Sequence, residues 1–139
     1  MILTDSDLII AAKTIWGEAR GEDFTGKMAV AEVIVNRAIR TDGQFALDTT
    51  LAVTCLRSKQ FSCWNPHDPN MQKMLLIGPD DVMYRSGLEA LLRVINNGAE
   101  LTLTNGATHY HTKKVSPSWS DGHIPSAIIG SHLFYNDVK

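Results

Sequence analysis

The segment from Gly26 to Ile39 constrains the fold more than any other part of the sequence, because it is apolar on most sides. Its apolar residues fill more than one helical stripe: Met28, Ala29, Val30, Ala31, Val33, Ile34, Val35 and Ala38. A helix that is hydrophobic all round is stable only when other elements surround it. We therefore expect a helix over this segment, capped by Thr25, that forms the axis of the core.

Shorter helices are expected before and after this axis. Thr4 followed by Asp7 resembles a capping box, which predicts a helix from about Asp5 to Ala19 with Gly21 as its stop. Three more helical segments follow, at about Thr50 to Leu56, from Asp68-Pro69 to about Leu76, and at about Asp80 to Asn97. In the last of these, five apolar residues are expected to face inward: Val82, Leu88, Leu91, Leu92 and Ile95.

After residue 100 the hydrophobic period changes from helical to alternating. Apolar and polar residues alternate in 101–104 and again in 107–112, on either side of Asn105-Gly106, which is a strong hairpin signal. Residues 128–135 form a short apolar closing segment of strand or extended type. We therefore expect a single α+β domain that spans all 139 residues, mostly helical, with a small β-hairpin near the C-terminus.

Composition and charge argue against several classes of protein. The formal net charge is -2 and no run of lysines and arginines is present, so nucleic-acid binding is not expected. No segment approaches the roughly 18 apolar residues of a membrane span, and the N-terminus lacks the features of a signal peptide. We expect a protein that is made in the cytoplasm and released to its target by a separate factor, or a catalytic domain excised from an exported protein.

Cys55 and Cys63 match no metal or redox motif, so two reduced thiols are expected, with a disulfide left open for a protein outside the cell.

Glu18 is the strongest candidate for a catalytic residue. It lies beside the apolar line of the first helix, which consists of Leu8, Ile9, Ala12, Ile15, Trp16 and Ala19. A carboxyl group held against apolar surface is harder to ionise, so it can keep a proton and donate it as a general acid. Gly17 and Gly21 flank it with positions that let another backbone or a polymeric ligand approach closely. The alternative is an ordinary ion pair with Arg20 or Arg37.

Two further carboxylates are candidates for a second acidic group. Glu22 lies four positions after Glu18, on the same face if the helix continues past Gly21. Glu32 interrupts an apolar row of the central helix, so it could be partly buried and directed toward the site. An ion pair with Arg37 or a nearby lysine is an equally good interpretation of Glu32.

Aromatic and polar residues suited to a sugar chain lie where regular structure is weakest. Carbohydrate sites combine flat apolar faces with a few hydrogen-bonding groups. The candidate substrate-binding residues are Gln60, Phe61, His109, Tyr110, His111, Ser118 and Trp119. For Phe61, Tyr110 and Trp119, packing in the core is an equally good interpretation.

Two other functions have to be weighed against an enzyme that uses Glu18 as a general acid on a sugar chain. The first is a zinc-dependent amidase or peptidase that would use the C-terminal histidines His109, His111, His123 and His132. No HExxH or similarly tight motif supports it, and we expect no metal. The second is a non-catalytic glycan-binding module, which needs aromatic platforms but no buried acid.

Several segments of the sequence together resemble one known family. In chain order they are Ala12-x-x-Ile15-Trp16-Gly17-Glu18-Ala19-Arg20-Gly21-Glu22, Gly26-x-x-Ala29-Val30-Ala31-x-Val33-Ile34-x-Asn36-Arg37, Gln60-Phe61-Ser62-Cys63, Gly106-Ala107-Thr108-His109-Tyr110-His111, Pro117-Ser118-Trp119 and Ile129-Gly130-x-His132-x-Phe134-Tyr135. With them the chain resembles the cell-wall hydrolase family typified by the bacterial spore cortex-lytic enzyme SleB. An insertion at 68–81 departs from that pattern and is expected to alter the rim of the groove.

The resemblance implies a lysozyme-like, lytic-transglycosylase-like fold and an enzyme that cuts the β-1,4 bond between N-acetylmuramic acid and N-acetylglucosamine in peptidoglycan. The family's catalytic glutamate falls on Glu18. A muramidase route would need a second carboxylate, whereas a lytic transglycosylase lets the muramic acid's own 6-hydroxyl attack and gives a 1,6-anhydro product. We favour the second route, with no cofactor and a monomeric protein. A stand-alone domain of this size also resembles a bacteriophage endolysin.

Overall fold

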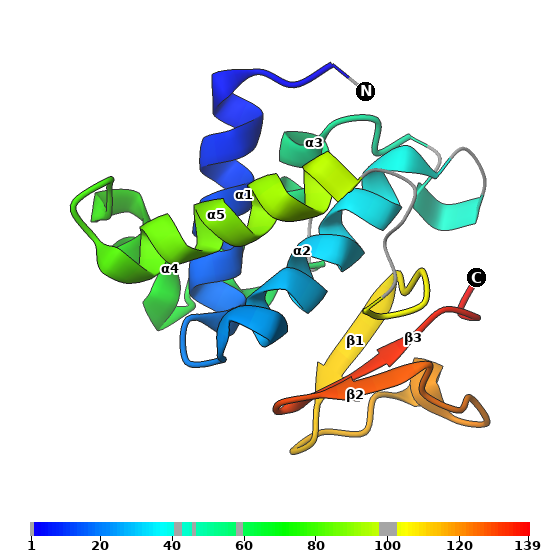
Figure 1. The fold of residues 1–139 in the computed structure, drawn as a ribbon. Helices are drawn as coiled ribbons and strands as arrows, with labels where there is room; N and C mark the ends of the chain where they lie inside the picture. The colour runs from blue at the N-terminus through cyan, green and yellow to red at the C-terminus, as the bar shows by residue number, and fades with distance from the viewer. Residues whose placement is uncertain (1, 41–42, 46, 58–59, 98–102) are drawn as a thin grey trace.

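The computed structural model describes residues 2–40, 43–45, 47–57, 60–97 and 103–139. Its helices are α1 (Asp5–Ala19), α2 (Phe24–Ile39), α3 (Leu51–Leu56), α4 (Pro69–Leu76) and α5 (Val82–Asn97), with short 3₁₀ turns η1 (Gly43–Phe45), η2 (Ser62–Trp64) and η3 (Ser118–Ser120). Its strands are β1 (His109–Thr112), β2 (Ala127–Ile129) and β3 (His132–Tyr135). The helices form one part of the molecule and the small sheet lies beside them (Figure 1). The predicted α+β, mostly helical fold is confirmed. Among the described helices, none has the length and apolar character needed to cross a bilayer.

Helix α2 is the buried axis that the sequence predicts. Val30 and Ile34 are completely buried, and α1 and α5 pack against this helix. Its N-cap is Asp23 and not Thr25, because the Asp23 carboxylate accepts a hydrogen bond from the backbone N–H of Gly26 at 2.9 Å. A carboxylate at this position also interacts favourably with the positive end of the helix dipole.

The outer helices begin at the predicted caps, but α5 faces the core differently from the prediction. The capping box of Thr4 and Asp7 is present at the start of α1. In α5 the expected inward residues Val82 and Leu92 are 61% and 40% exposed. Leu91 is completely buried and Leu88 and Ile95 are partly buried, as predicted, while the rest of the buried face consists of Tyr84, Gly87, Ala90 and Val94. Asp81 accepts a hydrogen bond from the Tyr84 N–H at 2.9 Å in the first turn of this helix.

The three strands form an antiparallel sheet in the order β1-β3-β2. Strand β1 pairs with β3, with His109 opposite Tyr135, whereas the sequence predicts a hairpin with 101–104. Residues 101 and 102 lie outside the described residues, and Leu103 and Thr104 donate their backbone N–H groups to Glu32 instead of to a strand. The hairpin near the C-terminus is formed by β2 and β3, which turn between Ile129 and His132.

Buried polar residues on α2 attach the chain before β1 to the helical part. The Glu32 carboxylate accepts from the backbone N–H and the hydroxyl of Thr104 at 3.0 and 2.8 Å. About one helical turn after Glu32, Asn36 donates to the Ala107 carbonyl at 2.9 Å, and the next residue, Arg37, donates to the Thr108 carbonyl at 2.6 Å. Bonds of this kind compensate the cost of burying polar side chains. They fix where β1 begins, and therefore where Tyr110 lies.

Candidate active site

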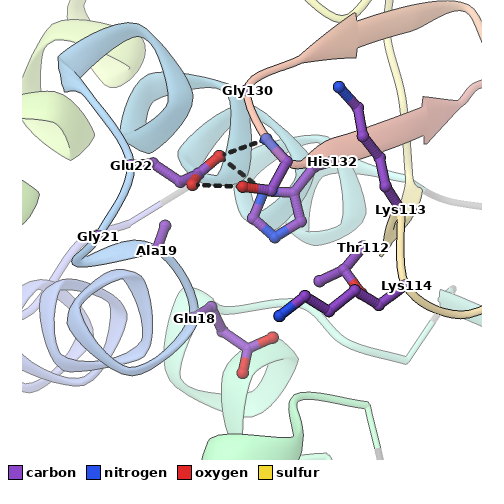
Figure 2. A pocket seen from close by; sticks show the side chains of 10 residues that line it. Glu18, Ala19, Gly21, Glu22, Thr112, Lys113, Lys114, Gly130 and His132 are labelled. Atoms are coloured by element: carbon purple, nitrogen blue, oxygen red, sulfur yellow. Dashed lines mark hydrogen bonds and ion pairs between the residues drawn. The ribbon is translucent and has the colours of Figure 1, made fainter.

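Glu18 lies in the last turn of α1 and borders a pocket of about 550 Å³ between this helix end and the sheet. The pocket is lined by Glu18, Ala19, Gly21, Glu22, Thr112, Lys113, Lys114, Gly130, Ser131 and His132. Figure 2 shows the two glutamates on the helical side, with His132 and the lysines on the side of the sheet. The Glu18 side chain is partly exposed to this pocket, so a ligand in the pocket can reach its carboxyl group.

Three donors from distant segments hold the Glu18 carboxyl group. The Tyr110 hydroxyl donates to Oε1 at 2.5 Å, and the Cys63 backbone N–H and the Ser62 hydroxyl approach Oε2 at 3.3 and 3.5 Å. Burial, together with the neighbouring Glu18, raises the pKa of Tyr110 well above its usual value, so its hydroxyl keeps its proton. A neutral hydroxyl and a backbone amide both stabilise a carboxylate more than a carboxylic acid.

Neither arginine that could have formed an ion pair with Glu18 does so. The Arg20 guanidinium lies 4.1 Å from the Trp16 ring centroid and donates to the Asn70 side chain at 3.0 Å. Arg37 is buried and donates a hydrogen bond to the backbone carbonyl of Thr108, the residue before β1. Burial lowers the pKa of Arg37 to about 10. The ordinary ion-pair interpretation of Glu18 is therefore not realised.

The two glycines that flank Glu18 differ in their surroundings, since Gly17 is closely packed and Gly21 is open. A Cβ atom on Gly17 would lie 2.6 Å from the Met74 sulfur and 2.7 Å from Cys63 Cβ. This glycine therefore lets η2 pack against α1, which brings the Cys63 N–H to Glu18. A Cβ atom on Gly21 would meet nothing within 4 Å, and Gly21 lines the open pocket.

Glu22 also lines the pocket, but its carboxylate is already bound. It accepts from the backbone N–H and the hydroxyl of Ser131 at 2.8 and 2.9 Å, and His132 Nδ1 lies 3.5 Å from it. Burial tends to raise its pKa, but the two bonds from Ser131 and the nearby His132 outweigh burial and lower it. Gly130, with φ of 57°, leaves the space that the carboxylate occupies, because a Cβ atom there would collide with Glu22 Oε1. His132 Nδ1 is buried and has no hydrogen-bond partner among the described residues.

Glu32 does not line the pocket. It is buried and all its contacts described above go to Leu103 and Thr104. Neither the predicted role of a second carboxylate nor the alternative ion pair with Arg37 is found. We assign Glu32 to folding, as the residue that anchors the segment before β1.

Four of the predicted substrate-binding residues surround a second pocket of about 300 Å³: Gln60, His109, Tyr110 and Trp119. Arg37, Gln44, Val138 and Lys139 complete its lining. Tyr110 therefore borders this pocket while its hydroxyl reaches Glu18. Burial and the nearby arginines lower the pKa of His109 to about 4, so this imidazole is neutral.

The other three predicted substrate-binding residues, Phe61, His111 and Ser118, line neither the Glu18 pocket nor the second pocket. Phe61 is buried, with the Arg37 guanidinium 4.9 Å from its ring centroid, so it belongs to the core. His111 Nε2 lies 2.8 Å from the Tyr135 hydroxyl, and its ring stacks on that tyrosine. Ser118 is exposed in η3, next to Trp119.

The four C-terminal histidines do not converge on one point that could hold a metal ion. His123 lies 2.9 Å from Asp137, while His109 contacts Gln44 and Thr108. Across the described ranges, no three histidine, cysteine, aspartate or glutamate side chains are arranged to hold a metal ion. Among the described residues, no set of ligands supports the zinc-dependent alternative.

Sequence reasoning missed the residues of the pocket wall opposite Glu18. Lys113 and Lys114 directly follow the predicted His-Tyr-His segment, and Gly130 and Ser131 form the turn between β2 and β3. A glycine followed by serine in the middle of the apolar closing segment was a turn signal, and it could have located this hairpin.

Comparison with known proteins identifies the family. Residues 21–135 match the family described as Cell Wall Hydrolase. The chain belongs to the cell wall hydrolase family. The matched range begins three residues after Glu18, so the comparison does not itself cover that residue. The resemblance seen in the sequence motifs is confirmed.

Individual proteins are similar over nearly the whole chain. A spore cortex-lytic enzyme of Halalkalibacterium halodurans is 30% identical over 96% of this chain, which spans 36% of that relative's length. The catalytic domain of the Bacillus cereus SleB protein has a TM-score of 0.74 at 22% identity, and covers 96% of this chain and 92% of its own. The catalytic domain of SleB from Bacillus anthracis has a TM-score of 0.73 at 22% identity, with 96% of each chain covered. At this identity the two structures establish the shared fold.

Proposed function

We propose that this domain degrades peptidoglycan by cleaving the β-1,4 bond between N-acetylmuramic acid and N-acetylglucosamine, with Glu18 as the general acid. The observation that carries the proposal is the Glu18 carboxyl group, which borders an open pocket and is held by Tyr110 and the Cys63 N–H. Membership of the cell wall hydrolase family supports the substrate. The relative from Bacillus anthracis is described as a germination-specific lytic transglycosylase, which supports the type of reaction.

In the proposed reaction, Glu18 passes its proton to the glycosidic oxygen as the bond from that oxygen to C1 of the muramic acid breaks. The 6-hydroxyl of the same sugar then attacks C1, and its proton returns to Glu18. The product is a 1,6-anhydro sugar, and the catalyst is regenerated. Between the two proton transfers Glu18 is a carboxylate, and this is the form that Tyr110 and the Cys63 N–H stabilise.

The contacts of Glu22 favour this route over hydrolysis. Glu18 and Glu22 are the two carboxylates that line the pocket. A hydrolase of the usual kind needs the second carboxylate to attack the sugar or to activate water. Glu22 accepts two hydrogen bonds from Ser131 and lies beside His132, so its oxygens are committed to the β2–β3 turn. A single-acid mechanism makes no demand on it.

The four residues around the second pocket are proposed to bind the glycan strand beyond the cleaved bond. Trp119 offers a partly exposed aromatic face, while Gln60 and the neutral His109 offer hydrogen-bonding groups. Tyr110 lies between this pocket and Glu18, so one strand could pass along both.

Mass spectrometry of the products from purified sacculi tests the proposal. The wild-type protein should release fragments with anhydro ends, which are lighter than hydrolysed ends by one water molecule. Glu18→Gln should lower the rate at least about a hundredfold, because the amide cannot donate the proton, while the fold is retained. Hydrolysed ends would contradict the anhydro route, and undiminished release by Glu18→Gln would contradict the role of Glu18. Binding to sacculi without any release by the wild type would indicate a glycan-binding module instead.

A further inference from the structure

Two lysines, Lys113 and Lys114, stand on the pocket wall opposite Glu18. Lys113 and Lys114 follow β1, are exposed, and line the same pocket as Glu18 and Glu22. In Figure 2 the Lys114 side chain extends across the pocket toward Glu18, while the Lys113 side chain points away from Glu18. Within the part of the chain that the structure describes, neither ammonium group forms an ion pair.

The two carboxylates that line this pocket, Glu18 and Glu22, lie beyond ion-pair distance of both lysines and accept hydrogen bonds from other groups. Glu18 receives the Tyr110 hydroxyl and the Cys63 N–H, and Glu22 receives both donors of Ser131. The chain as a whole carries a net charge of -2, so two unpaired cations at one pocket are not a consequence of a generally basic surface. Their position suits an anion supplied by the ligand.

The backbone holds both lysines at a fixed place beside the pocket. The Lys113 N–H donates to the Ser131 carbonyl at 2.9 Å, which extends the pairing of β1 with β3 by one residue. Val115 N–H donates to the Thr112 carbonyl at 3.3 Å and closes a turn around the two lysines. The lysines therefore project from a hydrogen-bonded turn next to Glu22's own anchor, Ser131.

We propose that Lys113 and Lys114 bind a carboxylate of the peptide-bearing substituent of muramic acid, and so direct the enzyme to glycan strands that carry free carboxylates. This inference rests on the proposed function. The lactyl-peptide substituent lies on the sugar whose bond is cleaved, so its carboxylates come close to a pocket that holds that bond. A wall phosphate attached through the 6-hydroxyl does not fit the same role, because it would block the attack that forms the anhydro product.

Binding to insoluble sacculi tests the inference in the Glu18→Gln background, where turnover does not interfere. Lys113→Gln combined with Lys114→Gln should weaken binding about threefold to tenfold at low salt, since exposed charge pairs are individually weak. Wild-type lysines should also make binding weaken with rising salt, and the double variant should lose most of that dependence. The matched control is Lys13→Gln with Lys73→Gln, which removes the same two charges away from the three described pockets and should bind normally.

Chemically altered sacculi identify the anion. Converting the carboxylates to methylamides should make the protein with both lysines and the double variant bind equally. Removing wall phosphates with hydrofluoric acid should leave their difference unchanged. Equal binding of the two proteins to untreated sacculi, or a difference that disappears only after removal of phosphate, would overturn the inference.

Activity measurements separate this inference from the proposed function. With Glu18 present, the double lysine variant should still form anhydro products, with a higher KM and a kcat within about twofold of wild type, because uniform binding affects KM. A variant that is as active as wild type at low substrate would overturn the inference and leave the proposed function intact. Loss of kcat with unchanged KM would also overturn it.

Discussion

The Tyr110 hydroxyl is the group through which the sheet acts on Glu18, 92 residues earlier in the chain. Tyr110→Phe removes this donor and keeps the ring, which packs near Phe134 and His132. Hydrogen bonds to charged groups contribute about 1.5–3 kcal/mol, so kcat should fall at least on the order of tenfold with little change in KM. Steady-state digestion of sacculi measures this. Tyr135→Phe is the matched control, since its hydroxyl contacts His111 instead, and it should stay within about twofold of wild type. Similar losses in both variants would contradict the assignment.

The buried His109 should make the stability of the protein depend on pH. Burial, and then the cations Arg37 and Arg40, lower its pKa from 6.5 to about 4. The unfolded chain therefore binds this proton more readily than the folded protein does, so the contribution of neutral His109 is complete above pH 6.5 and is lost as pH falls toward 4. The shift corresponds to about 3 kcal/mol of unfolding free energy. Urea unfolding at pH 7 and pH 4.5 should show a smaller difference for His109→Gln, whereas the exposed control His67→Gln should keep the wild-type difference.

At the scale of elements, the β2–β3 turn is built around the Glu22 carboxylate. Gly130→Ala places a Cβ where Glu22 Oε1 lies and forces a non-glycine residue into φ of 57°. Gly122→Ala is the matched control, because Gly122 has φ of 79° and open space around its Cβ position. Gly130→Ala should therefore destabilise the protein by about 1–2 kcal/mol more than Gly122→Ala, through loss of the bonds to Ser131.

A second substitution separates the collision from the backbone strain. In a Glu22→Ala background the two alanine substitutions should cost the same free energy of unfolding, because the carboxylate is absent. Chemical denaturation of Gly130→Ala and Gly122→Ala, each with and without Glu22→Ala, measures the coupling energy between position 130 and Glu22. If Gly130→Ala kept its excess cost without Glu22, the turn would be constrained by something other than the carboxylate.

The elements that the sequence predicts correctly are those whose signals are local. The caps Thr4, Thr50 and Asp68 each bond to the backbone two or three residues ahead, so the starts of α1, α3 and α4 follow from neighbouring residues. The strand pairing does not follow in this way, because Glu32 takes the N–H of Thr104, which lies 72 residues later. An alternating pattern around Asn105 indicates strands, but it does not contain the competing acceptor.

The same distinction holds at the site. Glu18 is recognisable because its neighbours in sequence are the apolar line and Gly17, and four of seven proposed ligand contacts do gather at one pocket. The partner that occupies Glu22 is Ser131, 109 residues later, and no pattern near Glu22 predicts it. Sequence periodicity therefore points to Glu18 as the proposed acid, and contacts between the helices and the sheet determine that Glu22 is bound by Ser131.

At the scale of the whole molecule, helices and sheet share one core in which both cysteines are buried and free. Cys55 lies in α3 and is completely buried, and Cys63 lies in η2 next to Gly17 and is 1% exposed. Burial raises the pKa of Cys55 to about 12 and also raises that of Cys63, so neither thiol is ionised near neutral pH. Only a thiolate reacts readily with an alkylating reagent. The native protein should therefore resist alkylation, and a reductant should leave its activity unchanged.

Alkylation of these two thiols measures whether the domain opens as one unit. Peptide mass spectrometry after timed exposure to iodoacetamide, in rising urea, should show Cys55 and Cys63 labelled together along the global unfolding transition. Cys55 lies in α3 and Cys63 in η2, and each of these elements contacts α1 separately, so equal labelling means that η2 does not detach from α1 by itself. Faster labelling of Cys63 in the absence of urea would show that η2 opens locally, and the position of the donor to Glu18 would then not be fixed by the core.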